Sequence, residues 1–294
     1  MSGQGAASLE PATPKLKLNK KGGMRRGVYI LPSLFTVGTL VCGYLAVLEV
    51  LRGSIAMTGG GGEGPGAAAF DNAAKAIGWA ILFDGFDGRI ARLTNSTSAF
   101  GREFDSLADV VTFGLAPAIL AYAWGVRAIS EPFGPGLLHH IPQVGWIVTF
   151  AYLICGAARL GRFNIDTVKP TTDRRYFVGM PIPAAAGTIA AIVHWEKTPL
   201  GHWGYSLGWM VVVTLLAFLM VSRMRYYSFK TWDLRRRRSY IAIIFLGLII
   251  WGIWVYSEPV LLIIAVTYTL SGVVLRITSK FRPHPSAPEE VHAA

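Results

Sequence analysis

Four aspartates carry the clearest chemical signal in the sequence. They occur as two pairs, Asp84 with Asp87 and Asp105 with Asp109. In a helix, spacings of three and four residues place each pair on one face, so two antiparallel helices would present four carboxylates to one cleft. Carboxylates gathered so closely repel one another unless cations neutralise them. We therefore predict a metal site with four aspartate ligands.

The ligand type indicates which metal the site would hold. Carboxylate oxygens suit hard divalent cations such as Mg²⁺ or Mn²⁺, and no His or Cys cluster in the sequence favours zinc. A pair of such ions could bridge phosphate oxygens and stabilise a leaving group. Gly88 and Arg92 share the helix face of Asp84 and Asp87. The glycine would let a ligand approach the backbone, and the arginine offers a fork for phosphate. These residues indicate two divalent cations and a phosphate-bearing substrate.

The composition indicates which elements must position the aspartates. Of 294 residues, 52% are apolar and only 15% are charged, and the mean hydropathy is +0.44. A helix needs about 20 mainly apolar residues to cross a bilayer, since its backbone must be satisfied internally there. The sequence therefore predicts an all-α integral membrane protein, a polytopic bundle of about eight transmembrane helices. The expected spans are 29–50, 70–92, 104–124, 144–164, 177–195, 205–222, 239–256 and 258–277.

We expect the chain to form one membrane domain with a tail at each end. We find no tandem repeat, so residues 28–278 are expected to form the domain. Residues 1–27 are polar and lack a signal-peptide cleavage pattern, which predicts a mobile cytoplasmic tail. Residues 279–294 form the expected C-terminal tail.

The basic residues predict the orientation. With eight spans, 24 of the 28 Lys and Arg residues fall on one side, and Lys and Arg accumulate on the cytoplasmic side. We expect a multi-pass protein of the cell (inner) membrane, with both termini and the aspartates cytoplasmic. The net charge of +11 does not indicate nucleic-acid binding, because the basic residues lie between apolar spans.

The stretch from Asp84 to Asp109 reads D-x2-D-G-x2-A-R-x8-G-x3-D-x3-D. It resembles the signature of the CDP-alcohol phosphatidyltransferase family at every fixed position. The resemblance implies that Asp84, Asp87 and Asp105 are metal ligands, with Asp84 shared by two ions. It implies that Asp109 also touches a metal and takes the proton from the incoming hydroxyl. The residues implied to contact the CDP part of the lipid substrate are Gly88, Arg92, Ser98, Ser33 and Thr36.

Further segments resemble the bacterial and archaeal phosphatidylserine synthases of this family, namely 104–111, 158–164, 179–184 and 226–230. This likeness implies that CDP-diacylglycerol and L-serine react in the lipid membrane to give phosphatidylserine and CMP. It leaves open whether the protein is a homodimer. The first span departs from the pattern, because Ser33 and Thr39 stand where relatives commonly carry Asn.

Several alternatives remain open at this point. Arg159 and Arg162 could bind a lipid phosphate or the serine carboxylate, but positive-inside anchoring explains them equally well. Glycerol phosphate or inositol phosphate could replace serine as the acceptor. A cation transporter would use the four aspartates as an ion path, but it predicts acids on several helices near mid-membrane. We expect no metal at the histidines on the far side, which are His139, His140, His194 and His202.

Overall fold

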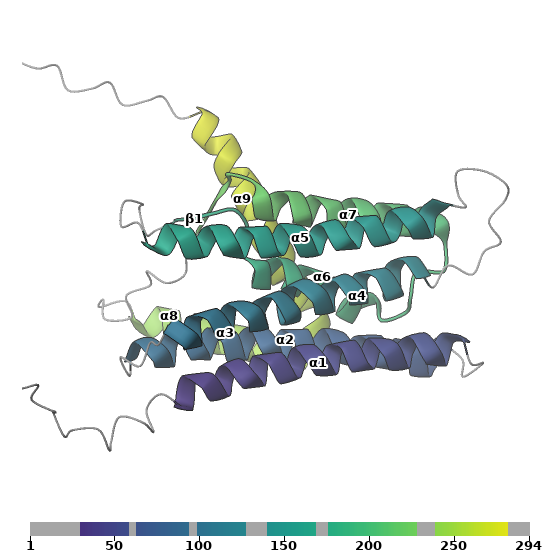
Figure 1. Cartoon of the computed structure of the whole chain (residues 1–294), viewed down its shortest axis with the longest axis horizontal. Helices are drawn as coiled ribbons and strands as arrows, with labels where there is room; N and C mark the ends of the chain where they lie inside the picture. Colours follow the sequence, from purple (N-terminus) through teal and green to yellow (C-terminus); the bar gives the residue numbers. More distant parts are fainter. Residues whose placement is uncertain are drawn as a thin grey trace, which may run out of the picture.

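The computed structural model describes residues 30–58, 63–93, 99–127, 140–168, 176–227 and 239–281. Long helices run roughly alongside one another and make up most of these residues (Figure 1). In chain order the helices are α1 (Ile30–Thr58), α2 (Glu63–Leu93), α3 (Ala99–Asp109), the π-helix η2 (Val110–Leu115), α4 (Ala116–Tyr122), the π-helix η3 (Ala123–Arg127), α5 (Ile141–Val168), α6 (Ile182–Glu196), α7 (Trp203–Val221), α8 (Ser239–Val255) and α9 (Ser257–Phe281). The expected tail at 1–27 lies outside the described residues, and α9 continues past residue 278, where we expected the membrane domain to end.

Five helical segments are long and apolar enough to cross a membrane. They are Leu34–Thr58, Phe100–Arg127, Ile141–Ile165, Trp203–Val221 and Ser257–Thr278. Of the other expected spans, the one at 70–92 lies within α2 and carries several charged side chains. Helices α6 and α8 have 15 and 17 residues, whereas a span of the hydrocarbon core needs about 20. The described part of the chain is therefore a helical membrane protein, as expected.

One expected span is wrong at its start. We predicted a helix over 177–195, but Tyr176–Val178 forms strand β1, which pairs antiparallel with β2 (Arg225–Tyr227). Helix α6 begins only at Ile182. Gly179 has a φ of +83°, a left-handed conformation that glycine adopts without strain, and Pro181 directly precedes the helix. Gly179 and Pro181 therefore explain why the helix begins later than the hydropathy predicted.

The buried face of α2 combines alanines with larger apolar residues. Phe70, Ala73, Ile77 and Ala80 recur every three or four residues and are almost completely buried. Small side chains let neighbouring helices approach closely, which stabilises packing where lipid supplies no hydrophobic drive. Asp84 continues the same spacing toward the C-terminal end of α2. Asp84 therefore lies on the same face of α2 as the residues that pack against the neighbouring helices.

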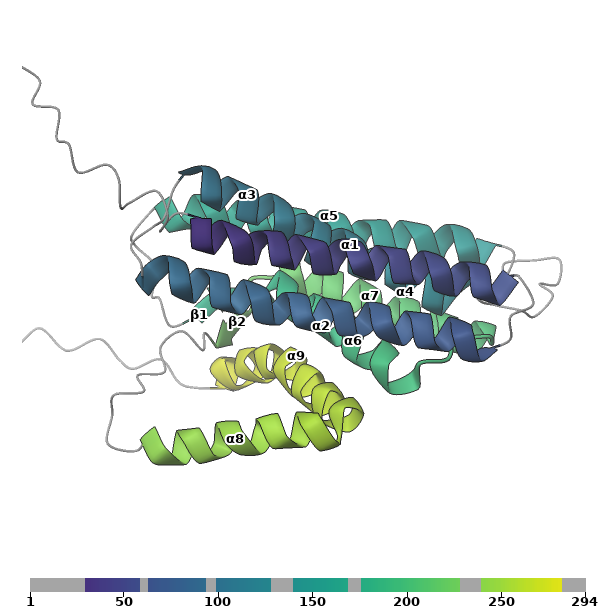
Figure 2. The same cartoon turned by 90° about the horizontal axis from the view of Figure 1, so that it is seen from below.

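Helices α8 and α9 form a hairpin beside the main bundle (Figure 2). Large apolar side chains on α8 are exposed, among them Leu248, Trp251 and Trp254. Lipid would cover such a surface in a membrane protein. The hairpin contacts the bundle through α9, which packs on α6 and β2.

A polar cluster, which we term the clasp, joins α9 to α2 and α6. The buried His194 of α6 contacts Asp71 of α2 through Nδ1, and its Nε2 lies 3.0 Å from the hydroxyl of Ser257 on α9. Lys75 forms a salt bridge with Asp71 at 2.8 Å. The clasp lies about 20 Å along α2 from Asp84, given a rise of 1.5 Å for each of 13 residues.

A second ion pair lies next to the clasp. Lys197, at the end of α6, donates a hydrogen bond to Glu258 of α9. This hydrogen bond raises the pKa of Lys197 above its usual value.

The histidines His140, His194 and His202 belong to no candidate metal cluster among the described residues. His139 lies outside the described residues.

Candidate active site

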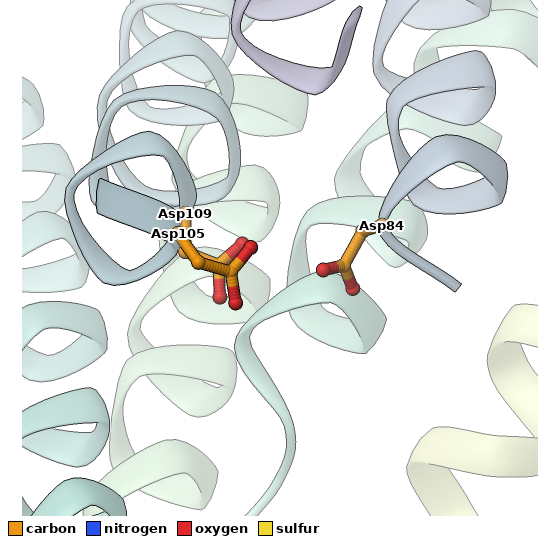
Figure 3. Close-up of side chains that lie close together, drawn as sticks. All are labelled: Asp84, Asp105 and Asp109. Carbon is orange, nitrogen blue, oxygen red and sulfur yellow. The ribbon is translucent and has the colours of Figure 1, made fainter. Parts of the chain in front are cut away.

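Three of the predicted aspartates come together between α2 and α3. One carboxylate oxygen each from Asp84, Asp105 and Asp109 lies within 4.8 Å of the others. Figure 3 shows the neighbouring carboxylates of Asp105 and Asp109 facing that of Asp84 from the other helix. The spacing of four residues explains this arrangement, because it places Asp105 and Asp109 one turn apart on the same face of α3.

Asp87 lies at the edge of this group, where it interacts electrostatically with Asp105 and Asp109. Its side chain is buried, and its Oδ2 accepts a hydrogen bond from the hydroxyl of Thr36 on α1. In this arrangement Asp87 is tied to α1, while Asp84 faces α3. The two carboxylates of α2 therefore have different surroundings although they lie one turn apart.

The acidic group has the properties of a cation site. Oδ1 of Asp109 is buried and has no hydrogen-bond partner among the described residues. A buried oxygen without a partner is costly, and the neighbouring carboxylates increase that cost by repulsion. A divalent cation would remove both penalties, and oxygen ligands are what Mg²⁺ and Mn²⁺ prefer. The residues present thus fit a divalent metal.

The two arginines of α5 have different positions. Arg159 is only 8% exposed, interacts electrostatically with Asp109, and stacks over the ring of Phe163 at 5.4 Å. Arg162 instead donates a hydrogen bond of 3.3 Å to the carbonyl oxygen of Val221 at the end of α7. Arg159 is therefore the arginine that adjoins the acidic group.

Four other residues singled out from the sequence can be placed only partly. Gly88 and Arg92 lie within α2, and Ser33 lies within α1, but the surroundings of Gly88 and the side chains of Arg92 and Ser33 are outside the described part of the structure. Ser98 lies outside the described residues altogether.

Sequence reasoning missed some contacts that support the site. Asn164 of α5 donates a hydrogen bond of 2.9 Å to the hydroxyl of Ser106, which lies between the two aspartates of α3. Both residues fall in segments that resemble phosphatidylserine synthases, and this likeness was the sequence feature that could have pointed to them. The contact of Thr36 with Asp87 could not be foreseen from spacing, because 51 residues separate them.

The comparisons with known proteins agree with this geometry. The model of the CDP-alcohol phosphatidyltransferase family matches residues 29–221, which include all four aspartates. The chain belongs to this family. A Helicobacter pylori protein named CDP-diacylglycerol–serine O-phosphatidyltransferase is 34% identical over 223 residues, which cover 76% of this chain and 82% of that protein.

Relatives from other organisms carry the same name. A Bacillus subtilis protein is 33% identical over 201 residues, covering 68% of this chain and 91% of its own length. A yeast protein, from Saccharomyces cerevisiae, is 36% identical over 119 residues, covering 39% of this chain and 38% of its own. The family match ends at Val221, so α8 and α9 lie beyond the part that the whole CDP-alcohol phosphatidyltransferase family shares.

Proposed function

We propose that this protein transfers the phosphatidyl group of CDP-diacylglycerol to L-serine and so produces phosphatidylserine and CMP. The convergence of three carboxylates in a helical membrane protein of this family is the observation that carries the proposal. The choice of serine rests on relatives that are named for that acceptor and align with most of this chain.

The acidic group is the proposed metal centre. Asp84, Asp87, Asp105 and Asp109 would hold two divalent cations, Mg²⁺ or Mn²⁺, with Asp84 shared by both. When bound, such ions supply positive charge that orients the diphosphate and stabilises the departing phosphate. The carboxylates of α2 and α3 would hold the diphosphate end of the lipid at this end of the bundle, while its acyl chains remain in the bilayer.

Asp109 is the proposed general base. The hydroxyl oxygen of serine attacks the phosphorus bonded to the diacylglycerol oxygen, and Asp109 accepts the hydroxyl proton. A new oxygen–phosphorus bond forms as the bond to the CMP phosphate breaks, so CMP leaves with the bridging oxygen. The partnerless Oδ1 of Asp109 supports this role, because no described donor competes for it.

The remaining site residues are assigned to substrate binding. We assign Arg159 to an anionic group of the substrates, the serine carboxylate or the lipid phosphate, because it adjoins Asp109. Gly88, Arg92, Ser98 and Ser33 are proposed to contact the CDP moiety. Thr36, which we expected in the same role, donates its hydrogen bond to Asp87, so we propose that it orients that carboxylate.

The proposed arrangement in the membrane has eight crossings, with both termini and the acidic group on the cytoplasmic side of the cell membrane. Support comes from the distribution of charge, since 24 of 28 Lys and Arg residues fall on that side. The alternating directions of successive helices are compatible with it: α1 and α8 begin at the end of the molecule where β1 and β2 lie (Figure 2).

An acceptor panel tests the choice of serine. Purified protein in mixed micelles with CDP-diacylglycerol is offered serine, glycerol 3-phosphate or inositol phosphate at equal concentration, and the lipid products are separated. We expect phosphatidylserine as the main product. Preferential use of either phosphate-bearing acceptor would contradict serine while leaving the family chemistry intact.

A further inference from the structure

The helix that carries Asp105 and Asp109 changes character directly after Asp109. Residues Val110–Leu115 form the π-helix η2, in which the N–H of Ala116 bonds to the carbonyl of Val111, five residues earlier. Such π-turns are rare and often occur at functional sites. A π-turn shifts the faces of the helix on either side of it, so its position determines which way the preceding aspartates point.

The cause of the π-turn lies in the sequence. In an α-helix the N–H of residue 117 would bond to the carbonyl of Phe113, but residue 117 is proline and has no N–H. The hydroxyl of Tyr152 on α5 donates to that carbonyl at 3.1 Å. Tyr152 is completely buried, so this bond forms away from water. The tyrosine thus compensates for the donor that Pro117 lacks.

Helix α1 holds η2 from a second direction. The hydroxyl of Thr112 donates to the carbonyl of Thr39 at 3.2 Å. The helices approach so closely here that a Cβ on Gly43 would lie 2.9 Å from the Cα of Thr112. Because Thr36 of α1 also bonds to Asp87, the same helix contacts α2 at the acidic group and the segment that follows Asp109.

We propose that Tyr152 and Thr112 are positioning residues for the metal centre: by fixing η2, they set the placement of Asp109 opposite Asp84. This inference rests on the proposed function for the role of the centre, but the contacts of η2 stand independently of it. Groups that orient metal ligands from outside typically affect metal affinity or activity by about 10–100-fold.

The test compares Tyr152→Phe with Tyr226→Phe in the full-length protein. Tyr226 is a matched control, since it is also fully buried and its hydroxyl donates to a helix carbonyl, that of Thr269, at 3.4 Å. We expect Tyr152→Phe to lower kcat about tenfold and to weaken Mn²⁺ binding, followed by electron paramagnetic resonance, by a similar factor. Tyr226→Phe should leave both within about twofold, whatever its effect on thermal stability.

A second pair of variants keeps the proposal testable if Tyr152→Phe does not fold. Thr112→Val removes the hydroxyl and should weaken Mn²⁺ binding, whereas Thr112→Ser keeps the donor and should restore it. Unchanged kcat and Mn²⁺ affinity in a folded Tyr152→Phe protein, or in Thr112→Val, would overturn the positioning role. Wild-type protein that binds Mn²⁺ but does not transfer to serine would instead contradict the proposed function alone.

Discussion

Asp109 differs from its neighbour Asp105 in one respect that bears on mechanism: its buried Oδ1 has no partner among the described residues. Both side chains lie on α3 and both face Asp84. Helical spacing was enough to predict that these three carboxylates meet, because residues four apart share a face. Spacing could not predict that Asp87 bonds to Thr36, or that Arg159 rather than Arg162 adjoins Asp109, since both depend on how separate helices pack.

The first prediction separates chemistry from binding at α3. Asp109→Asn keeps the shape of the side chain but removes its basicity, so turnover should fall by about 10²–10⁴-fold while CDP-diacylglycerol still binds in the presence of metal. Asp105→Asn should weaken metal retention and lipid affinity together. Turnover and the dissociation constant of the lipid are measured at saturating metal.

Glu103→Gln serves as the control, because Glu103 is an exposed acid on the same helix and should tolerate the change. Parallel losses of binding and turnover in Asp109→Asn would identify Asp109 as mainly a metal ligand and remove it as the general base.

The second prediction concerns the arginines of α5. Arg159→Gln should raise the KM for serine or for CDP-diacylglycerol by about tenfold or more, because it removes a buried positive charge that interacts electrostatically with Asp109 and could bind an anionic group of the substrate. Arg162→Gln should change neither KM by more than about twofold, since its guanidinium is bonded to the end of α7. Steady-state kinetics with each substrate varied in turn identifies the group that Arg159 binds. Equal effects of the two variants would argue that both arginines act only as anchors.

At the scale of elements, hydropathy located the helices but not their irregularities. The π-turn η2 coincides with Pro117, a signal that hydropathy does not weigh, and near η3 the indole of Trp209 donates to the carbonyl of Ala121 at 2.9 Å, a contact across 88 residues. The strand pair β1–β2 replaced the start of an expected helix, because Gly179 turns the chain. A hydropathy pattern is averaged over several turns of a helix, so it does not show a single π-turn or the replacement of one helical turn by a short strand.

The clasp gives a prediction at this scale. His194→Leu removes the bonds from α6 to Asp71 and Ser257, and it should lower the free energy of unfolding by about 1–2 kcal/mol. Arg52→Gln is the control, because it breaks only the exposed pair with Glu49 and should cost less than about 0.5 kcal/mol. Chemical denaturation in detergent measures both. A loss for His194→Leu no larger than for the control would show that the clasp adds nothing to stability.

In the proposed eight-span arrangement, the acidic group and the clasp lie toward opposite faces of the membrane. Single cysteines are introduced after replacing Cys42 and Cys155 with serine. With an impermeant thiol reagent, Thr58→Cys and Thr198→Cys should react from outside the cell, whereas Arg223→Cys should react only from the cytoplasmic side. All three native residues are exposed, so accessibility alone cannot separate them. Labelling of Thr198→Cys and Arg223→Cys from the same side would refute the eight-span arrangement.

Metal-dependent transfer to serine is measured by following labelled serine and CMP together. Purified protein in liposomes that contain CDP-diacylglycerol is given labelled L-serine, with excess chelator and then with Mg²⁺ or Mn²⁺ restored. We predict no transfer in chelator, and after metal addition equal amounts of labelled phosphatidylserine and CMP, with Asp84→Asn at least as damaging as Asp87→Asn. Full transfer in excess chelator, or CMP release without labelled lipid, would contradict a metal-dependent phosphatidyl transfer to serine.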